Sequence, residues 1–389
     1  MQSKIPLVDL KAQHAKLWPE ISKRIEKVFS DCAFIGGEEK EAFEKEFATL
    51  MGARFCIGVG NGTDSLSIIL KALKIGGVNG SDHEVITVAN SFFASSETIG
   101  TSGAKPVFID CHTHTLLMDL DKTEKLLETR KVAGTIGKIK AMLVVHLYGR
   151  ILDMPRVMAI AQKYNLFIIE DCAQSHLASI DGKKSGTWGH AGSFSFYPGK
   201  NLGAAGDAGA IVTNDPLLAN QMKMIANHGR IDKYNHQFEG YNSRLDNLQA
   251  AILRVKLKYI QEWTTARRQN AQTYQQLLEG VTGVIRPQLP PAEEHVYHHY
   301  IIRVKNRDKI IEVMKKNGIE VGIHYPIMLP ALEAYKSRGY SISDFPVANQ
   351  YQHEVLSLPM FPELTNDNQK FIVDTLKLAL ADYSKENFL

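Results

Sequence analysis

Short runs of Val, Ile and Leu alternate with segments of helical periodicity along the first half of the chain, and this alternation limits the possible fold most strongly. Seven runs have strand character, and they lie at residues 54–59, 84–89, 106–110, 141–146, 166–170, 193–197 and 208–212. Several show little polar alternation, which is typical of strands covered on both faces. The pattern therefore predicts an α/β fold with a seven-stranded, mainly parallel sheet flanked by helices.

The last third of the chain has a different pattern. A long helical pattern runs from Leu245 to about Leu278, and strand patterns follow at residues 298–304 and 319–324. Helical patterns at residues 308–317, 345–355 and 366–382 complete a smaller α+β domain, which would close one side of a cleft. Because 389 residues exceed a single core, we expect two domains. An N-terminal arm and large domain would span residues 1–250, and a linking helix with a small domain would span residues 251–389.

The charge balance argues against several classes of partner. Forty-five Lys and Arg against 42 Asp and Glu leave a net charge of +3, and like charges form no run, so nucleic acid and membranes are not expected partners. The chain shows neither an apolar secretion signal nor an apolar run near the roughly 18 residues of a membrane span. We therefore expect a cytoplasmic protein. The four Cys and 14 His lack the spacing of a known metal site, so no metal is expected.

A glycine-rich loop between the last two strand patterns carries a reactive candidate. Lys200 lies in this loop, next to the Pro198–Gly199 turn, and Ser195 lies in the strand pattern before it. A lysine attacks a carbonyl only where its ammonium can lose a proton, and a turn beside packed strands favours this loss. The loop therefore indicates Schiff-base chemistry at Lys200. The alternative is an ordinary surface lysine in a hairpin loop.

The carboxyl ends of the predicted strands collect other polar and aromatic candidates. Ligands of parallel sheets bind at these ends, so we expect the residues there to form one site. They are Gly62 and Thr63, Asn90 to Phe93, Asp171 to Gln174, and Ser195 with Lys200. The glycines at positions 58, 60 and 62 match neither a dinucleotide fingerprint nor a P-loop.

Each candidate has a chemical use and a structural alternative. Free amides at the helix start and the Thr63 hydroxyl suit a phosphate, although Thr63 or Asp64 could simply cap the helix. Asp171 ends an apolar strand, so its carboxylate needs a partner such as a protonated pyridine nitrogen; otherwise it caps the next segment. Gln174 could contact a phenolic oxygen, and Phe92 could stack on a ring or belong to the core. Together with an amine, these are the parts of a pyridoxal phosphate site.

Nine motifs resemble those of the DegT/DnrJ/EryC1/StrS family of nucleotide-sugar aminotransferases, a branch of the fold-type I pyridoxal 5′-phosphate enzymes. In the family's order they are GNGTDSL, VANSFFAS, GAKPVFID, HLYGR, IEDCAQSHLA, SFSFYPGKNLGAAGDAGAIVTND, NHGR, GYNSRLDNLQAAIL and GIHYP. The resemblance covers nearly the whole chain. It implies a homodimer with shared active sites.

The resemblance also implies a role for each candidate. Lys200 would hold the cofactor as a Schiff base and move the proton between substrate and cofactor. Asp171 would pair with the pyridine nitrogen, Gln174 would contact the 3-hydroxyl, and Phe92 would stack on the ring. The cofactor phosphate would be held by Gly62, Thr63 and Ser195 and, across the dimer interface, by Asn242. Candidates for contacts to the sugar or its diphosphate are His324, Tyr325 and Arg230, with structural packing as the alternative for each.

Few positions depart from the family's pattern. Ala208 stands where glycine is common, and residues 326–331, PIMLPA, lack the histidine of the usual PxPLH. The second departure puts any substrate contact carried over to that loop in doubt. Relatives that dehydrate or deoxygenate sugars have histidine at the position of Lys200, so lysine favours transamination.

The predicted activity is transfer of an amino group from L-glutamate to a keto sugar linked to a nucleoside diphosphate. The stretch YNHQFEGYNSRLDNLQAAIL looks most like the branch that converts dTDP-3-keto-6-deoxyhexoses to dTDP-3-amino-3,6-dideoxyhexoses, as in the synthesis of an O-antigen or another surface polysaccharide. Amination of a 4-keto nucleotide sugar or a cyclitol ketone stays open, as do sugar dehydration and a non-catalytic regulatory role. The choice between dTDP and UDP is also open.

Overall fold

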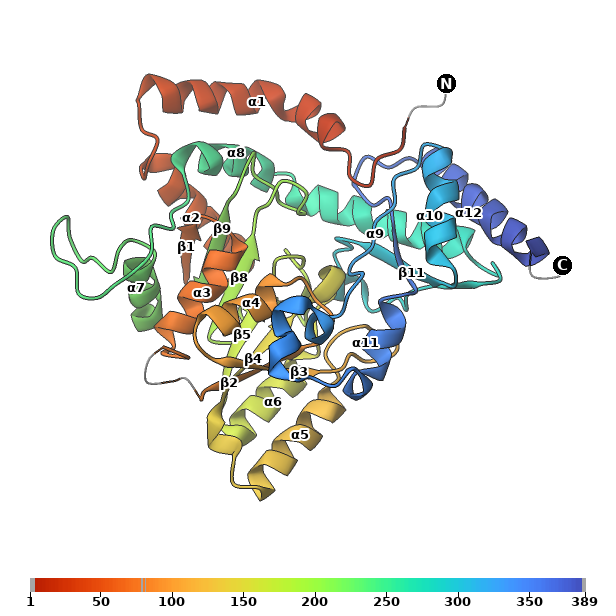
Figure 1. The fold of residues 1–389 in the computed structure, drawn as a ribbon. Helices are drawn as coiled ribbons and strands as arrows, with labels where there is room; N and C mark the ends of the chain where they lie inside the picture. The colour runs from red at the N-terminus through yellow and green to blue at the C-terminus, as the bar shows by residue number, and fades with distance from the viewer. Residues whose placement is uncertain (1–3, 78–79, 81, 387–389) are drawn as a thin grey trace.

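A seven-stranded sheet forms the centre of the computed structural model, which describes residues 4–77, 80 and 82–386 (Figure 1). The strand order is β1-β9-β8-β5-β4-β2-β3. Strand β9 is antiparallel to β1 and β8, and the other neighbouring pairs are parallel. The strands are β1 (Phe55–Val59), β2 (Glu84–Val88), β3 (Lys105–Ile109), β4 (Ile139–Val145), β5 (Phe167–Asp171), β8 (Ala191–Ser195) and β9 (Gly209–Thr213). The predicted fold class is confirmed.

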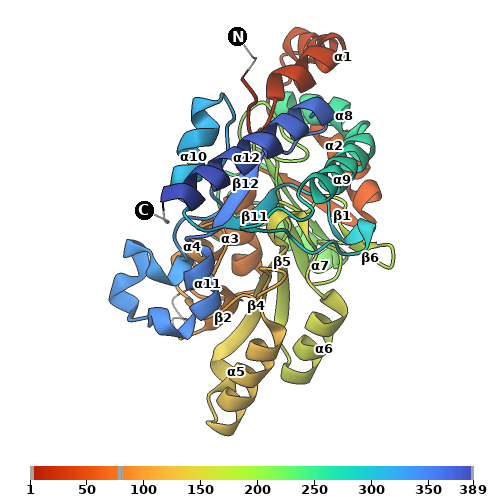
Figure 2. The same cartoon turned by 90° about the vertical axis from the view of Figure 1, so that its right-hand side faces the viewer.

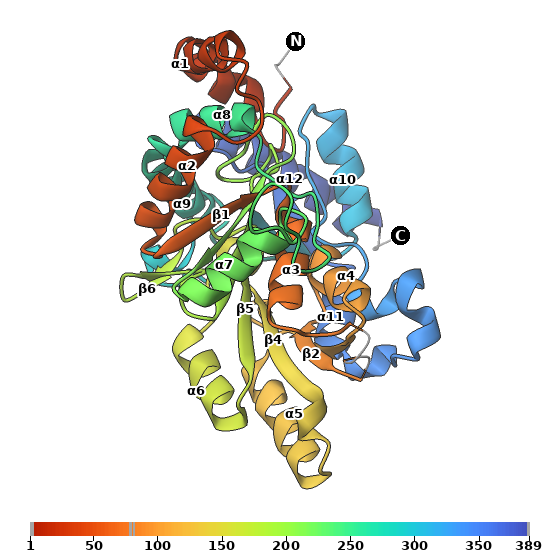
Figure 3. The ribbon, with the colours of Figure 1, turned by 90° about the vertical axis from the view of Figure 1, so that its left-hand side faces the viewer.

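Helices cover both faces of this sheet, which explains why its central strands are apolar throughout. Figure 3 shows α3 and α4 on one side of the sheet and α2 and α6 on the other. Side chains of Asp or Asn cap the first turn of five helices and fix where these helices begin. The helices of this part are α1 (Leu10–Ser30), α2 (Glu38–Met51), α3 (Gly62–Ala72), α4 (Ala94–Thr101), α5 (Leu120–Val132), α6 (Met154–Tyr164) and α7 (Pro216–Ile225).

The long helix predicted from residue 245 to 278 is two helices, so that prediction is wrong. Helix α8 (Asn247–Leu257) ends and α9 (Ile260–Leu277) begins within three residues. At the break, the amides of Lys258 and Tyr259 bond to carbonyls three residues back, which tightens the turn. Helix α8 packs on α1 and α2, whereas α9 packs on α12 (Asn366–Glu386). The apolar period runs through the break, so the sequence alone does not reveal it.

The small sheet contains two strands that the sequence analysis missed. It consists of β10 (Val284–Ile285), β11 (Tyr300–Val304) and β12 (Val355–Leu358), with α10 (Arg307–Lys316) and α12 beside it (Figure 2). Residues 319–324, predicted as a strand, form only single bridges, from Ile319 to Ile5 and from Gly322 to Ser357. The helix predicted over residues 345–355 is shorter, α11 (Pro346–Tyr351), because the chain then enters β12. The pattern of apolar residues alone therefore predicted a second strand at residues 319–324, whereas β10 and β12 are the strands that pair with β11.

After α10, the chain returns to the large sheet before it completes the small one. Met328, Tyr335, Phe345 and Tyr351 belong to the same buried cluster as the residues of the seven-stranded sheet. A separate cluster, which includes Ile5, holds together β11, β12, α9, α10 and α12. The proposed division at residue 250 stays a prediction. Within the described part of the chain, no helix is long and apolar enough to cross a membrane.

Candidate active site

The start of α3 meets the end of β8 at a point where only glycine fits. A Cβ at Gly62 would lie 2.7 Å from the Cβ of Ser195. The helix is capped by Asn61, whose Oδ1 accepts from the Asp64 amide at 2.8 Å. The structural alternative, a cap at Thr63 or Asp64, is therefore not what the structure shows. The Asn61 cap leaves the amides of Gly62 and Thr63 and the Thr63 hydroxyl without hydrogen-bond partners among the described residues. These free donors are the ones that a phosphate requires.

Lys200 lies beyond the end of β8 in the glycine-rich loop. Its amide donates to the Tyr197 carbonyl at 2.8 Å, which fixes the turn. No atom in the described part of the chain forms a hydrogen bond or ion pair with its Nζ. Burial lowers the pKa of Lys200 to about 8, against the opposing charge of Asp171. An amine with this pKa is partly unprotonated at neutral pH, as a nucleophile must be.

The carboxylate of Asp171 is buried at the end of β5, with 7% of the residue exposed. Its Oδ2 accepts from the Ser95 hydroxyl at 2.8 Å, and its Oδ1 accepts from the Ala173 amide at 3.1 Å. Ser91 in turn contacts Ser95, with their hydroxyl oxygens 3.0 Å apart. The sequence analysis did not assign Ser95, although it is the last residue of the VANSFFAS motif, shortly after the predicted strand end.

Gln174 joins the sheet to the segment that follows residue 322. Its Nε2 donates to the Tyr325 hydroxyl at 3.0 Å, and its Oε1 accepts from the Tyr148 amide at 2.6 Å. The ring of Phe92 lies 5.9 Å from that of Tyr325. Because Phe92 is 56% exposed, it is not a core residue, and its ring face is available to a ligand. The structure therefore brings these predicted site residues together.

Four histidines lie close enough to Lys200 to interact with its charge, and the sequence analysis named only His324 among them. His176, His298 and His299 are buried, and His324 is half-buried. Burial is the main cause that lowers the pKa of each, to about 3 in His176, to about 4 in His324, and well below the usual value in His298 and His299. The charge of Lys200 lowers all four further. These imidazoles are therefore neutral at neutral pH and add no charge beside the amine.

Asn201, the residue after Lys200, connects the Lys200 loop to the segment that leads into β11. It is 4% exposed, and its Nδ2 donates to the Val296 carbonyl at 3.1 Å. Its Oδ1 lies 3.1 Å from Nδ1 of His298. In the sequence, His298 and His299 appear only as the start of a predicted strand, HHYIIRV. Because that stretch was interpreted as a strand, the two histidines were not assigned to the site. The rings of His299 and His324 stack with centroids 3.8 Å apart.

Arg230 and Asn242 lie apart from this cluster in the loop between α7 and α8, which projects beyond α7 (Figure 1). Asn242 is exposed and forms a backbone bridge to Asn227. Neither residue has a hydrogen bond or ring contact with Lys200 or Asp171 in the described ranges. Their predicted roles at the cofactor and the sugar diphosphate stay predictions.

One buried group, of His146, Glu170 and Cys172, has the composition of a metal site. Its ligand atoms lie within 4.8 Å of one another. However, Glu170 accepts hydrogen bonds from three backbone amides and contacts His146 Nε2 at 3.0 Å, while His146 Nδ1 accepts from an amide. Because the polar atoms of His146 and Glu170 already have hydrogen-bond partners, this group anchors the loop before β8, and we do not propose a metal there.

The donor set fits pyridoxal 5′-phosphate. The free amides at Gly62 and Thr63 suit its phosphate, and the close approach of Ser195 excludes a side chain from the cradle. The buried carboxylate of Asp171 retains capacity to accept a hydrogen bond from a pyridinium. The unpaired amine of Lys200 suits its aldehyde.

The chain is similar to known proteins over nearly its whole length. The sequence pattern of the DegT/DnrJ/EryC1/StrS aminotransferase family matches residues 16–377. A "pleiotropic regulatory protein" of Geobacillus stearothermophilus is 41% identical, over 96% of this chain and 97% of the relative. The dTDP-3-amino-3,6-dideoxy-alpha-D-galactopyranose transaminase of Aneurinibacillus thermoaerophilus is 39% identical, over 96% and 98%. A UDP-N-acetyl-3-dehydro-alpha-D-glucosamine 3-aminotransferase of Acidithiobacillus ferrooxidans is 39% identical, over 97% and 98%.

A solved structure has the same fold. The crystal structure of Streptomyces venezuelae DesV in complex with a ketimine intermediate superimposes with a TM-score of 0.91. The match covers 97% of this chain and 98% of DesV, at 34% sequence identity.

Proposed function

The chain belongs to the DegT/DnrJ/EryC1/StrS aminotransferase family, and on that premise we propose that it aminates C3 of a 3-keto-6-deoxyhexose linked to dTDP, with L-glutamate as the amino donor. It is a pyridoxal 5′-phosphate enzyme that acts on nucleotide-linked keto sugars, as the sequence predicted. The proposed product is a dTDP-3-amino-3,6-dideoxyhexose. The Aneurinibacillus relative, named for such a sugar, supports this choice.

The chain's own side chains divide the work of the reaction. Pyridoxal 5′-phosphate supplies an aldehyde that takes up the amino group and a ring that withdraws electrons from the reacting carbon. Lys200, held with a pKa of about 8, would bind the aldehyde and move the proton at the reacting carbon. Asp171, oriented by Ser95, would hold the pyridine nitrogen in its protonated form. Gly62, Thr63 and Ser195 would bind the phosphate, and Phe92 and Gln174 would bind the ring.

The single observation that carries the proposed transamination is the environment of Lys200. Its Nζ has no hydrogen-bond partner in the described part of the chain, it is surrounded by neutral histidines, and the one carboxylate that acts on it is Asp171. A non-catalytic regulatory relative would need to have lost the amine or the carboxylate, and both are in place.

Incubation of the purified holoenzyme with L-glutamate and a dTDP-3-keto-6-deoxyhexose tests the proposal. We expect 2-oxoglutarate and a sugar product in which an amino group replaces the keto oxygen, both detected by mass spectrometry. The Lys200→Ala variant should fold, as judged by circular dichroism, and should form neither product. Failure of the wild-type enzyme to aminate this sugar, while it aminates a 4-keto isomer or a cyclitol ketone, would refute the proposed substrate.

A UDP-linked 2-acetamido-3-keto sugar is a second candidate substrate. The Acidithiobacillus relative, named for such a substrate, is as similar to this chain as the Aneurinibacillus transaminase. Both candidates place the ketone at C3. Competition between the two sugars in one assay, with the ratio of kcat/KM values as the readout, decides between them.

The proposed function includes a homodimer with shared active sites in the cytoplasm. Helix α1 and the turn after it expose large apolar side chains, of Trp18 (58%), Phe29 (56%) and Ile35 (57%), as expected of a surface that another subunit covers. If Asn242 acts across the interface, a mixture of Lys200→Ala and Asn242→Ala subunits should regain activity that neither variant has alone. Monomeric protein by light scattering would contradict the dimer.

A further inference from the structure

A small cavity shares a wall with the candidate active site. It has a volume of about 80 Å³ and is lined by residues 113–116, by Leu147, Tyr148 and Arg150, by residues 285–288, and by the segment that leads into β11. Two of its wall residues also contact the active site. His299 stacks on His324, and the Tyr148 amide donates to Gln174. A ligand in this cavity would therefore lie close to the catalytic cluster without occupying it.

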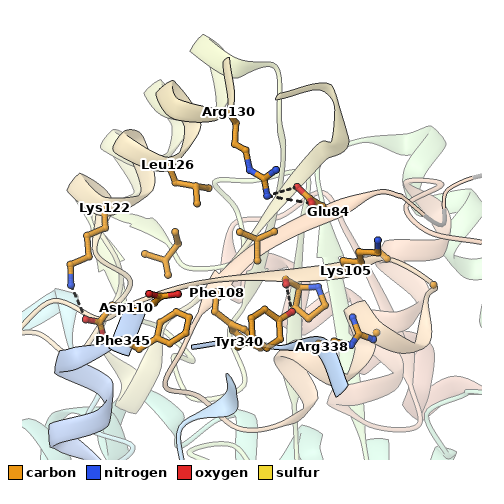
Figure 4. Close-up of a pocket in the computed structure, with 17 residues that line it drawn as sticks. Glu84, Lys105, Phe108, Asp110, Lys122, Leu126, Arg130, Arg338, Tyr340 and Phe345 are labelled. Carbon is orange, nitrogen blue, oxygen red and sulfur yellow. Dashed lines mark hydrogen bonds and ion pairs between the residues drawn. The ribbon is translucent and has the colours of Figure 1, made fainter. Parts of the chain in front are cut away.

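Three arginines line this cavity, Arg150, Arg286 and Arg303. Three histidines line it as well, and two of them, His295 and His299, are neutral because burial lowers their pKa values well below the usual value. In the described part of the chain no Asp or Glu lines it. A larger cavity of about 850 Å³, beside β3, differs in this respect (Figure 4). There, Lys122 is paired with Asp110, and Arg130 is paired with Glu84. The carboxylates that pair with these two cations line the larger cavity itself, whereas no carboxylate among the described residues lines the smaller one.

Two side chains of the small cavity have donors without an acceptor. Arg303 binds Glu354, and Arg286 donates to a backbone carbonyl. By contrast, the half-buried guanidinium of Arg150 forms neither a hydrogen bond nor an ion pair with any described residue. Tyr300 is fully buried, and no described atom is a partner for its hydroxyl. Buried donors of this kind normally have partners.

Burial lowers the pKa of Arg150, and the carboxylate of Glu294 opposes this effect only through space. A guanidinium nonetheless stays charged in proteins. Its N–H groups therefore need hydrogen-bond acceptors, and an anionic acceptor would also compensate its charge. The cavity is large enough for a few waters or one small anion.

We propose that this cavity binds a small oxyanion, with the guanidinium of Arg150 as the main ligand and the Tyr300 hydroxyl as a second donor. A guanidinium presents two parallel N–H groups that match the oxygens of a carboxylate or a phosphate. The lack of a lining carboxylate removes the repulsion that such a ligand would otherwise meet. Inorganic phosphate and a small dicarboxylate share this chemistry.

Calorimetric titration of the holoenzyme tests the proposal. The cofactor then occupies its own phosphate cradle, so added ions do not bind there. Inorganic phosphate and succinate are titrated separately in a chloride buffer at neutral pH, and the stronger binder identifies the source of the oxyanion. We expect one saturable site per chain that depends on Arg150, whereas any binding of succinate in the place of the amino donor should be the same in the Arg150→Gln variant. Arg150→Gln should weaken this binding at least about tenfold, because the paired donors are lost, and Tyr300→Phe should weaken it a few-fold.

Two arginine variants elsewhere serve as controls. Arg338→Gln changes an exposed arginine of the larger cavity, and Arg230→Gln changes the candidate for the sugar diphosphate; both should bind the oxyanion like the wild type. The cofactor absorbance band reports folding of each variant. If Arg150→Gln lacks this band, Arg150→Lys replaces it, since lysine cannot present the paired donors. Absence of saturable binding of either ion to the wild type, or unchanged affinity in the Arg150 variant, would overturn the proposal.

Discussion

Replacement of Gly62 by alanine should weaken cofactor binding more than it weakens the fold. The new Cβ would lie 2.7 Å from the Cβ of Ser195 and 3.3 Å from its Cα and Oγ. Comfortable carbon contacts are about 3.5–4.0 Å, so the start of α3 or the end of β8 must move by about 1 Å. This movement displaces the free amides of Gly62 and Thr63 from the position in which they meet the phosphate.

The magnitudes follow from the contact and from the helix position. Overpacking costs about 1–3 kcal/mol, and the better helix propensity of alanine offsets up to about 1 kcal/mol. With the full offset, the free energy of unfolding should therefore fall by about 0–2 kcal/mol. Loss of one hydrogen bond to a charged phosphate costs about 1.5–3 kcal/mol, which raises the Kd for pyridoxal 5′-phosphate about 10- to 100-fold.

Reconstitution of the apoprotein gives the Kd from the rise of the cofactor absorbance band, and urea denaturation gives the free energy of unfolding. Gly137→Ala is the matched control, because a Cβ at Gly137 has no atom within 4 Å. That variant should resemble the wild type in both measurements. A Gly62→Ala protein with wild-type cofactor affinity would refute the placement of the phosphate at the start of α3.

Three further substitutions test the site and its supports. Ser95→Ala removes the hydroxyl that donates to Asp171 and should lower kcat/KM about tenfold or more. Ser96→Ala removes a hydroxyl that donates to the Phe93 carbonyl and not to Asp171, and it should not lower kcat/KM; equal rates of the two variants in steady-state assays would contradict the role of Ser95. In Glu170→Gln, an amide replaces the carboxylate that accepts from three backbone amides. The free energy of unfolding, measured by urea denaturation, should fall by about 3 kcal/mol or more; a fall below about 1 kcal/mol would contradict the role of Glu170 as an anchor. Burial lowers the pKa of Lys256 to about 8, so between pH 8 and about 10.5 the unfolded chain binds this proton more tightly. The stability of the wild type relative to Lys256→Met should therefore rise with pH across that window, by up to roughly 3 kcal/mol, and a pH-independent difference would show that the lysine is not strained by burial.

The strands, most helices and the central site residues were predictable because their signals are local. Apolar runs marked all seven strands of the large sheet to within two residues at most ends. Asp171 stood out because a charged residue at the end of a buried strand needs a partner, and Lys200 stood out because it follows a Pro-Gly turn beside packed strands. The family resemblance then supplied their roles. Local signals failed where packing partners decide the outcome, as at the break between α8 and α9.

The tertiary structure alone decided the surroundings of these residues. Asp171 depends on Ser95, 76 positions earlier in the chain, and no local pattern announces such a contact. The neutral histidines beside Lys200 come from three separate segments of the chain, and their pKa values are low because the fold buries them together. Periodicity and motifs in the sequence thus determine the sheet, the amine and the carboxylate. Burial and distant contacts, which exist only once the chain has folded, set the charge state in which that amine and carboxylate can react.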